Sequence, residues 1–155
     1  VWKGDTINFF ASHLRKGQVF YGFDTFTGLP EDWHENTDYK KGMFDVDGKL
    51  PNVLKNVRLI KGLFQDTLPS FLLAKNGPCA FIHIDCDLYT STLYALETLK
   101  DRVVDGTIIA FDEYHNCYNW QDHEYKAFQE FVSKYKIEYE YIAHSDRSRT
   151  AVRIL

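Results

Sequence analysis

Acidic side chains in this sequence follow two apolar segments at the points where those segments end. Asp85 comes directly after the apolar segment 79–84, and Asp112 and Glu113 come directly after the apolar segment 107–111. If these segments are neighbouring strands of a parallel sheet, their carboxyl ends lie at one edge, which is where such sheets bind ligands. Carboxylates gathered at one edge repel one another unless a cation or protons intervene.

Hard oxygen ligands of this kind suit Mg²⁺, Mn²⁺ or Ca²⁺. We therefore predict that Asp85, Asp112 and Glu113 hold a divalent cation. The alternative is that each acid is a solvated strand end or a helix cap, which is easier to accept for one acid than for the set. Asp87 stays open to both interpretations, because it could cap the following helix or belong to the site.

Other single residues give weaker signals. Asp24 ends a short apolar segment, and in dinucleotide-type folds an acid at this point accepts hydrogen bonds from ribose hydroxyls. His83 lies within an apolar segment and is predicted to be a structural histidine of the core. His115 follows the acid pair and could be a base or an ordinary loop residue.

The order of expected elements predicts an α/β fold. Apolar periodicity and glycine or proline breaks predict helices and strands in alternation, which is typical of a Rossmann-like, mostly parallel sheet with helices on both faces. The last two strands are joined by a linker too short for a helix, so they should form an antiparallel hairpin. The expected helices are 6–15, 68–74, 91–104 and 124–135, and the expected strands are 19–23, 57–62, 79–84, 107–111, 137–143 and 150–155.

Bulk composition excludes several classes of protein. The chain has 155 residues, 45% of them apolar, which suits one domain with a packed core. The formal net charge of −4, with no run of Lys or Arg longer than two, argues against nucleic acid as a partner, and no apolar stretch is long enough to span a membrane. Three cysteines without metal spacing are typical of reduced thiols in the cytoplasm. Whether the chain forms a homo-oligomer is left open.

Four strings resemble the macrocin O-methyltransferase family. They are GFDTFTGLP at 22–30, GLFQDTLP at 62–69, HIDCDLY at 83–89 and FDEY at 111–114, and they occur in family order over nearly the whole chain. Members of that family are bacterial, metal-dependent sugar O-methyltransferases with the class I methyltransferase fold. The resemblance implies that this chain uses S-adenosylmethionine and Mg²⁺ to methylate a hydroxyl of a sugar or of another small molecule.

The resemblance also implies roles for single residues. Asp24 would bind the ribose hydroxyls of the cofactor with Thr25 beside it, and Phe64 and Gln65 would flank the adenine. Asp85, Asp112 and Glu113 would hold the metal, where the family often has a second aspartate in place of Glu113. Either Asp85 or Asp87 would be the general base. The full implied set of cofactor contacts is Gly4, Asp24, Thr25, Phe64, Gln65 and Asp85.

The beginning of the chain departs from the family. The first family motif reads Glu-x-Gly-Val-x-x-Gly, whereas this chain starts at VWKG, so we expect a single methyltransferase domain over 1–155 whose first strand is largely missing. That departure keeps a second interpretation open, a catalytically inactive, methyltransferase-like binding domain. A dehydrogenase is disfavoured because no Gly-x-Gly-x-x-Gly motif occurs. Specificity for the acceptor is expected to lie in the loops 31–50 and 114–122.

Overall fold

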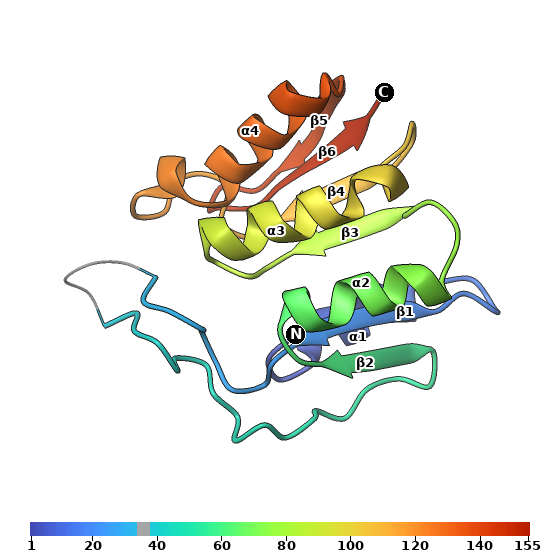
Figure 1. Ribbon diagram of the computed structural model, residues 1–155, viewed down its shortest axis with the longest axis vertical. Coiled ribbons are helices and arrows are strands. Elements are labelled where there is room, and N and C mark those ends of the chain that lie inside the picture. Colours follow the sequence, from blue (N-terminus) through green and yellow to red (C-terminus); the bar gives the residue numbers. More distant parts are fainter. Residues whose placement is uncertain (34–37) are drawn as a thin grey trace. The chain divides into compact units, whose positions relative to one another are not determined.

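A computed structural model describes residues 1–33 and 38–155 and divides the chain into two compact units, residues 1–67 and 68–155, which we describe separately (Figure 1). The prediction that the loop 31–50 selects the acceptor therefore falls partly, at 34–37, outside the described residues. Among the described residues, no helix has the length and apolarity needed to cross a bilayer.

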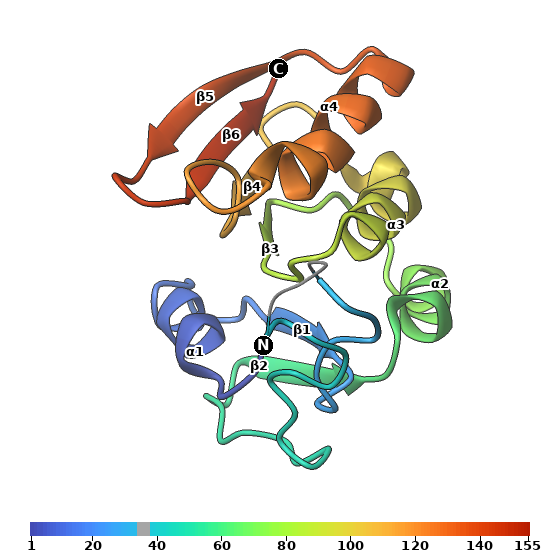
Figure 2. The same cartoon turned by 90° about the vertical axis from the view of Figure 1, so that its left-hand side faces the viewer.

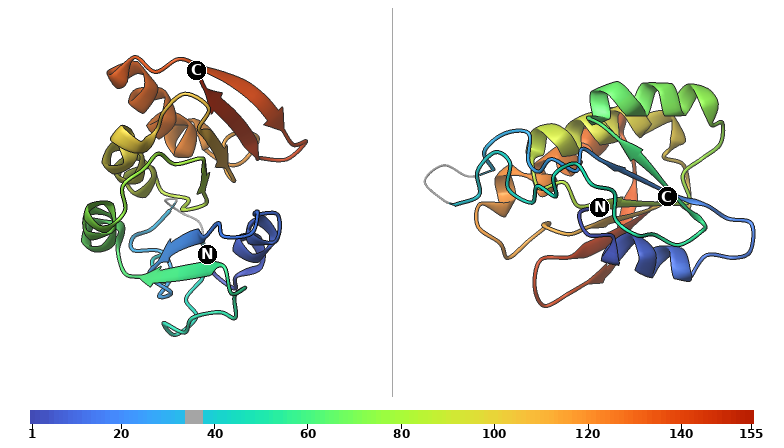
Figure 3. Two further views of the ribbon diagram at one scale, coloured as in Figure 1. Left: turned by 90° about the vertical axis from the view of Figure 1, so that its right-hand side faces the viewer. Right: turned by 90° about the horizontal axis from the view of Figure 1, so that it is seen from below.

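The first unit is built on a pair of parallel strands. Strand β1 (Phe20–Asp24) pairs in parallel with β2 (Val57–Lys61), and helix α1 (Asp5–Ser12) packs beside them (Figure 3). Ile7 and Ala11 of α1 and Val57 of β2 are buried together and form the centre of this small core. The bounds of both strands lie within one residue of the predicted strands 19–23 and 57–62.

Helix α1 differs from the predicted helix 6–15 at both ends. Asp5 is its first residue, and Gly4 occupies the N-cap position with φ 90°. The helix ends at Ser12, where the Ser12 hydroxyl donates to the Phe9 carbonyl (2.7 Å). Side-chain hydrogen bonds of this kind compete with the helical ladder, and periodicity alone does not reveal them.

The segment between β1 and β2 is irregular, as predicted. Its described residues form no helix or strand, although Thr27 and Asp45 make an isolated antiparallel bridge. Gly28 is required here, because φ is 78° and an added Cβ would lie 2.3 Å from the Met43 carbonyl oxygen. The glycine lets two parts of this long loop pass in close contact.

Helix α2 (Phe64–Ala74) starts one turn earlier than the predicted helix 68–74 and crosses the boundary between the units. Proline is favoured in the first turn of a helix, and Pro69 would lie in the first turn of a helix 68–74. In the structure Pro69 lies in the interior of the helix, where it removes one backbone hydrogen bond. The Thr67 hydroxyl donates to the Leu63 carbonyl (2.8 Å) in the turn that precedes it.

The second unit holds a four-stranded sheet in the order β3-β4-β6-β5 (Figure 2). The first two strands are parallel, and the last two form the antiparallel hairpin that the short linker predicts, with β6 also antiparallel to β4. The strands are β3 (Phe81–Ile84), β4 (Ile108–Phe111), β5 (Tyr139–His144) and β6 (Thr150–Ile154).

Helices α3 (Tyr89–Leu99) and α4 (Glu124–Tyr135) cover one face of this sheet (Figure 1). Phe111 of β4 and Phe128 of α4 are almost fully buried, and their ring centroids are 5.0 Å apart. Helix α4 has the bounds predicted for it. Helix α3 is shorter than the predicted 91–104, because a 3₁₀ turn at Lys100–Arg102 replaces its last turn.

Candidate functional site

Two acidic turns follow β3 and β4 and lie next to each other. The parallel register pairs Ile84 with Phe111, the last residues of the two strands. The Asp112 backbone N–H then donates to the Ile84 carbonyl (3.1 Å), which carries the ladder one residue further. Asp85 and the Asp112–Glu113 pair therefore leave the sheet at the same edge, as the sequence predicts.

Three carboxylates converge at this edge. Asp85, Asp87 and Glu113 each offer one carboxylate oxygen, and these oxygens all lie within 4.8 Å of one another. Asp87 reaches the group through a left-handed backbone conformation, φ 63°, within a turn closed by the Leu88 N–H and the Cys86 carbonyl (2.6 Å). Leu88, and not Asp87, occupies the N-cap position of α3, so the capping interpretation of Asp87 is wrong.

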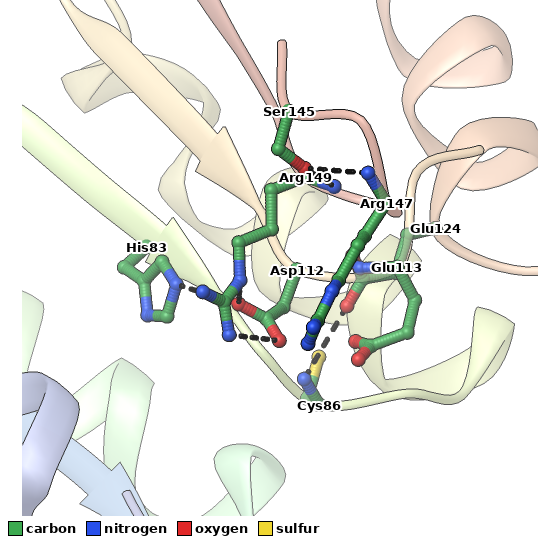
Figure 4. Close-up of polar contacts among 8 residues, drawn as sticks. All are labelled: His83, Cys86, Asp112, Glu113, Glu124, Ser145, Arg147 and Arg149. Atoms are coloured by element: carbon green, nitrogen blue, oxygen red, sulfur yellow. Dashed lines mark hydrogen bonds and ion pairs between the residues drawn. The ribbon is translucent and has the colours of Figure 1, made fainter. Parts of the chain in front are cut away.

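Asp112 has different partners from this group of three. The Arg149 guanidinium donates to both of its carboxylate oxygens, from Nε at 2.6 Å and from Nη2 at 3.3 Å, and His83 Nε2 lies 3.7 Å away (Figure 4). Burial favours the neutral form of Asp112, but contacts with His83 and Arg149 outweigh it and hold the pKa of the carboxyl below its ordinary value. The side chain of His83 thus faces an acid at the edge of the sheet.

The Glu113 carboxyl is in the opposite electrostatic situation. Burial, followed by the negative charges of Glu124 and Asp87, raises the pKa of Glu113 to about 10. Its Oε2 atom is buried and has no hydrogen-bond partner among the described residues. Without a cation, the carboxyl therefore binds a proton at neutral pH.

Glu124, the first residue of α4, is a member of this site that the sequence reasoning missed. Its side chain is fully buried, and its carboxyl oxygens accept hydrogen bonds from the backbone N–H groups of Cys86 (3.4 Å) and Glu113 (3.1 Å). Burial raises the pKa of this carboxyl well above its ordinary value, although the two backbone donors act against that shift. An acid in the first turn of a helix is common, so position alone gave no signal.

Asp24, the predicted ribose ligand, ends β1 in the first unit. Its Oδ2 atom lies 2.9 Å from the Val1 amino nitrogen and accepts the Trp2 backbone N–H (3.0 Å), while Oδ1 accepts the Phe26 N–H (2.8 Å). Burial raises the pKa of Asp24, and the backbone donors of Phe26 and Trp2 act against that rise because they favour the ionised carboxylate.

The other predicted cofactor residues of the first unit have local structural roles. Gly4 is buried with φ 90°, and an added Cβ would lie 3.1 Å from Pro51 Cβ. The Thr25 hydroxyl donates to the Gly28 carbonyl (3.3 Å) within the following turn. The remaining two predicted residues, Phe64 and Gln65, open helix α2. Asp85 belongs to the second unit.

Tyr114 continues the second acidic turn into the core. It is 4% exposed, and its hydroxyl lies 2.9 Å from that of Tyr141 and accepts a hydrogen bond from Gln129 Nε2 (3.0 Å). His115, whose role the sequence left open, places Nδ1 3.2 Å from the Thr150 hydroxyl. Both contacts tie the turn after β4 to the neighbouring hairpin.

Comparison with known proteins places the chain among methyltransferases. A family model described as a methyltransferase domain matches residues 1–114. Over 135 residues the chain is 32% identical to the 8-demethyl-8-(2,3-dimethoxy-alpha-L-rhamnosyl)-tetracenomycin-C 4'-O-methyltransferase of Streptomyces olivaceus. That match covers 74% of this chain and 50% of the relative, so the chain spans about half the length of that protein.

Two solved structures share the fold. The O-methyltransferase NovP superposes with a TM-score of 0.74 at 25% identity, over 99% of this chain and 68% of that one. The calicheamicin methyltransferase CalS11 superposes with a TM-score of 0.66 at 22% identity, over 87% of this chain and 60% of that one. The predicted α/β fold of class I methyltransferases is therefore confirmed.

Proposed function

Since the chain belongs to the methyltransferase domain family, we propose that it transfers the methyl group of S-adenosylmethionine to a hydroxyl, with a divalent cation, Mg²⁺, assisting. In this proposal residues 1–155 form one methyltransferase domain, and the enzyme works in the bacterial cytoplasm. The observation that carries it is the convergence of Asp85, Asp87 and Glu113 at the carboxyl ends of parallel strands, where α/β folds bind their ligands.

The proposed acceptor is a hydroxyl of a sugar or of a glycosylated metabolite. Support comes from the Streptomyces olivaceus relative, which is named for methylating a rhamnosyl group and is 32% identical over the matched residues. We propose that the loops 31–50 and 114–122, which come after β1 and β4 in the chain, select the acceptor.

The acidic cluster fits a hard divalent cation. Three carboxylate oxygens within 4.8 Å of one another are the donor type that Mg²⁺ and Mn²⁺ prefer. Glu113 Oε2, which is buried without a hydrogen-bond partner among the described residues, would gain one in the cation. We propose Asp85, Asp112 and Glu113 as ligands, with Asp87 close enough to share the site and Asp112 becoming available once Arg149 leaves it.

The protein's own residues divide the work. Bound S-adenosylmethionine would supply the activated methyl group for transfer to the acceptor oxygen. A bound Mg²⁺ would supply Lewis acidity that lowers the pKa of the acceptor hydroxyl. Asp85 or Asp87 would accept the proton that this hydroxyl loses. Asp24 would accept hydrogen bonds from the ribose hydroxyls and so orient the methyl donor, because a carboxylate offers about four acceptor positions and the Trp2 and Phe26 backbone N–H groups use only part of them.

Calorimetric titration with two ligands tests the proposal. S-adenosylmethionine and MnCl₂ should each bind the wild-type chain. Asp24→Asn should lower the affinity for S-adenosylmethionine and leave the affinity for Mn²⁺ unchanged. Asp85→Asn should lower the affinity for Mn²⁺ and abolish metal-stimulated methyl transfer to a rhamnosylated acceptor. Asp101→Asn, which alters an exposed acid of the 3₁₀ turn, is the matched control and should behave like the wild type.

Cofactor binding, cation binding and turnover test different parts of the proposal. Cofactor and cation binding without turnover on any glycosylated acceptor would favour a binding domain without catalysis. Absence of any cofactor heat, from a chain that melts cooperatively, would refute the methyltransferase assignment for this chain. Unchanged turnover in Asp85→Asn would remove that residue from the ligand set.

A further inference from the structure

Glu124 is buried in a way that a surface helix end does not explain. It is the first residue of α4, yet its side chain is 0% exposed, and among the described residues it is the only carboxylic acid with so little exposure. Burying an acid is costly unless its oxygens find donors. In Glu124 both oxygens have found them, and both donors are backbone N–H groups of the acidic turns.

The two donors belong to different turns. Cys86 lies between Asp85 and Asp87 in the turn after β3, and Glu113 lies in the turn after β4. One carboxyl group therefore bridges the two turns that supply the cluster, from Oε1 to the Cys86 nitrogen and from Oε2 to the Glu113 nitrogen (Figure 4). The backbone hydrogen bond from the Asp112 N–H to the Ile84 carbonyl continues the β3–β4 ladder to the start of the two turns. Past this hydrogen bond, the Glu124 carboxyl connects the two turns.

The position of Glu124 is set by the core and not by the turns. Helix α4 buries Ala127, Phe128, Phe131 and Val132 against the sheet, and each is at most 7% exposed. The His123 carbonyl accepts the Ala127 N–H (3.0 Å) and fixes the first turn of the helix. A rigidly docked helix thus presents a fixed pair of acceptors to two irregular segments.

We propose that Glu124 is a positioning residue that sets the spacing of Asp85, Asp87 and Glu113 for the divalent cation. This inference rests on the proposed cation site. Glu124 acts through the backbone of the two turns, because each of its oxygens already accepts an N–H, and it is not itself assigned as a ligand. Partners that orient metal ligands in this way commonly change metal affinity about 10- to 100-fold when they are replaced.

The test uses Glu124→Gln, Glu124→Ala and, as matched control, Glu138→Gln, which alters an exposed glutamate just after the same helix. Glutamine keeps one oxygen acceptor and replaces the other with an amide nitrogen that cannot accept. We expect Mn²⁺ affinity, followed by electron paramagnetic resonance, to fall about 10-fold in the glutamine variant and further in the alanine variant. The control should bind Mn²⁺ like the wild type.

Amide hydrogen exchange gives the second readout and needs no metal. In the wild type the amide protons of Cys86 and Glu113 should be protected. In Glu124→Gln one of these two amide protons should lose protection, while the amides in the middle of α4 stay protected. Protection in α4 shows that the glutamine variant is folded, so the test stands even if Glu124→Ala does not fold.

The outcomes are distinguishable. If amide protection is lost in Glu124→Gln as expected and Mn²⁺ affinity stays within twofold, the positioning role is overturned. If Mn²⁺ binding is lost while both amides stay protected, Glu124 is a ligand and the inference is also overturned. If the wild type itself binds no Mn²⁺, the proposed cation site fails, and with it the role of Glu124, whatever the amides show.

Discussion

Cation binding should release a proton from Glu113, and the structure predicts how many protons leave for each bound metal ion. With a pKa of about 10, the Glu113 carboxyl is almost wholly protonated at pH 7.5 in the absence of a cation. A carboxyl must lose its proton to coordinate a metal, so binding should release about one proton per Mn²⁺. The apparent affinity should then rise about tenfold for each pH unit between about pH 6 and pH 9.

Calorimetry in buffers with different ionisation enthalpies measures the protons released, and repeating the titration at several pH values gives the slope. Glu113→Gln should bind Mn²⁺ more weakly and with little proton release, because glutamine cannot titrate. Glu138→Gln should reproduce the wild-type slope. Tight Mn²⁺ binding by the wild type with no proton release and no slope would refute the reasoning, because it would mean that Glu113 is ionised before the cation arrives.

Three further predictions concern the surroundings of the cluster. Arg149→Gln removes the guanidinium, 68% exposed, that is paired with Asp112. Because exposed ion pairs are worth about 0–1 kcal/mol, the affinity for Mn²⁺ measured by calorimetry should rise up to about fivefold. A lower affinity would show that Arg149 orients Asp112 instead of competing with the metal ion. Tyr114→Phe removes the hydroxyl that accepts a hydrogen bond from Gln129, so urea titration should show a free energy of unfolding about 1 kcal/mol lower than in the wild type. An unchanged free energy of unfolding would contradict the contribution of this buried hydrogen bond. Without metal, Glu113 keeps its proton in the folded chain up to about pH 10, whereas the carboxyl of the unfolded chain loses it near pH 4.5. The free energy of unfolding should therefore fall with rising pH, by at most about 1.4 kcal/mol per pH unit. Urea titrations at pH 6 and pH 8 should show a smaller fall for Glu113→Gln, and the same fall in variant and wild type would count against the raised pKa of Glu113.

The elements with strong periodicity could be predicted from sequence, and those governed by local exceptions could not. Helix α4 was predicted to the residue because its apolar face is regular and an acid opens it. The start of α2 was misplaced because Pro69 is tolerated in the interior of the helix. The early end of α1 depends on the side-chain hydrogen bond of Ser12, which no apolar pattern records.

The site shows the same division. The edge at which Asp85, Asp112 and Glu113 would emerge followed from strand order, because parallel neighbours end at the same side. The partner of Asp112 did not follow, since Arg149 comes from the far end of the chain and reaches the site only through the hairpin. Glu124 could not be identified either, because its burial depends on how α4 docks.

In the absence of a cation the cluster limits its own repulsion in three ways, and they differ in how easily a cation can replace them. Glu113 carries a proton, Asp112 is paired with the exposed side chain of Arg149, and Glu124 accepts backbone N–H groups. A proton can leave, and an exposed guanidinium can turn toward solvent at little cost. Backbone donors held by two strands and a docked helix cannot move in that way. An arriving cation should therefore take the places of the proton and of Arg149, which would bring Asp112 into the ligand set that the sequence predicts. Glu124 should keep both of its hydrogen bonds, because these are what hold the turns in place while the charges around them change.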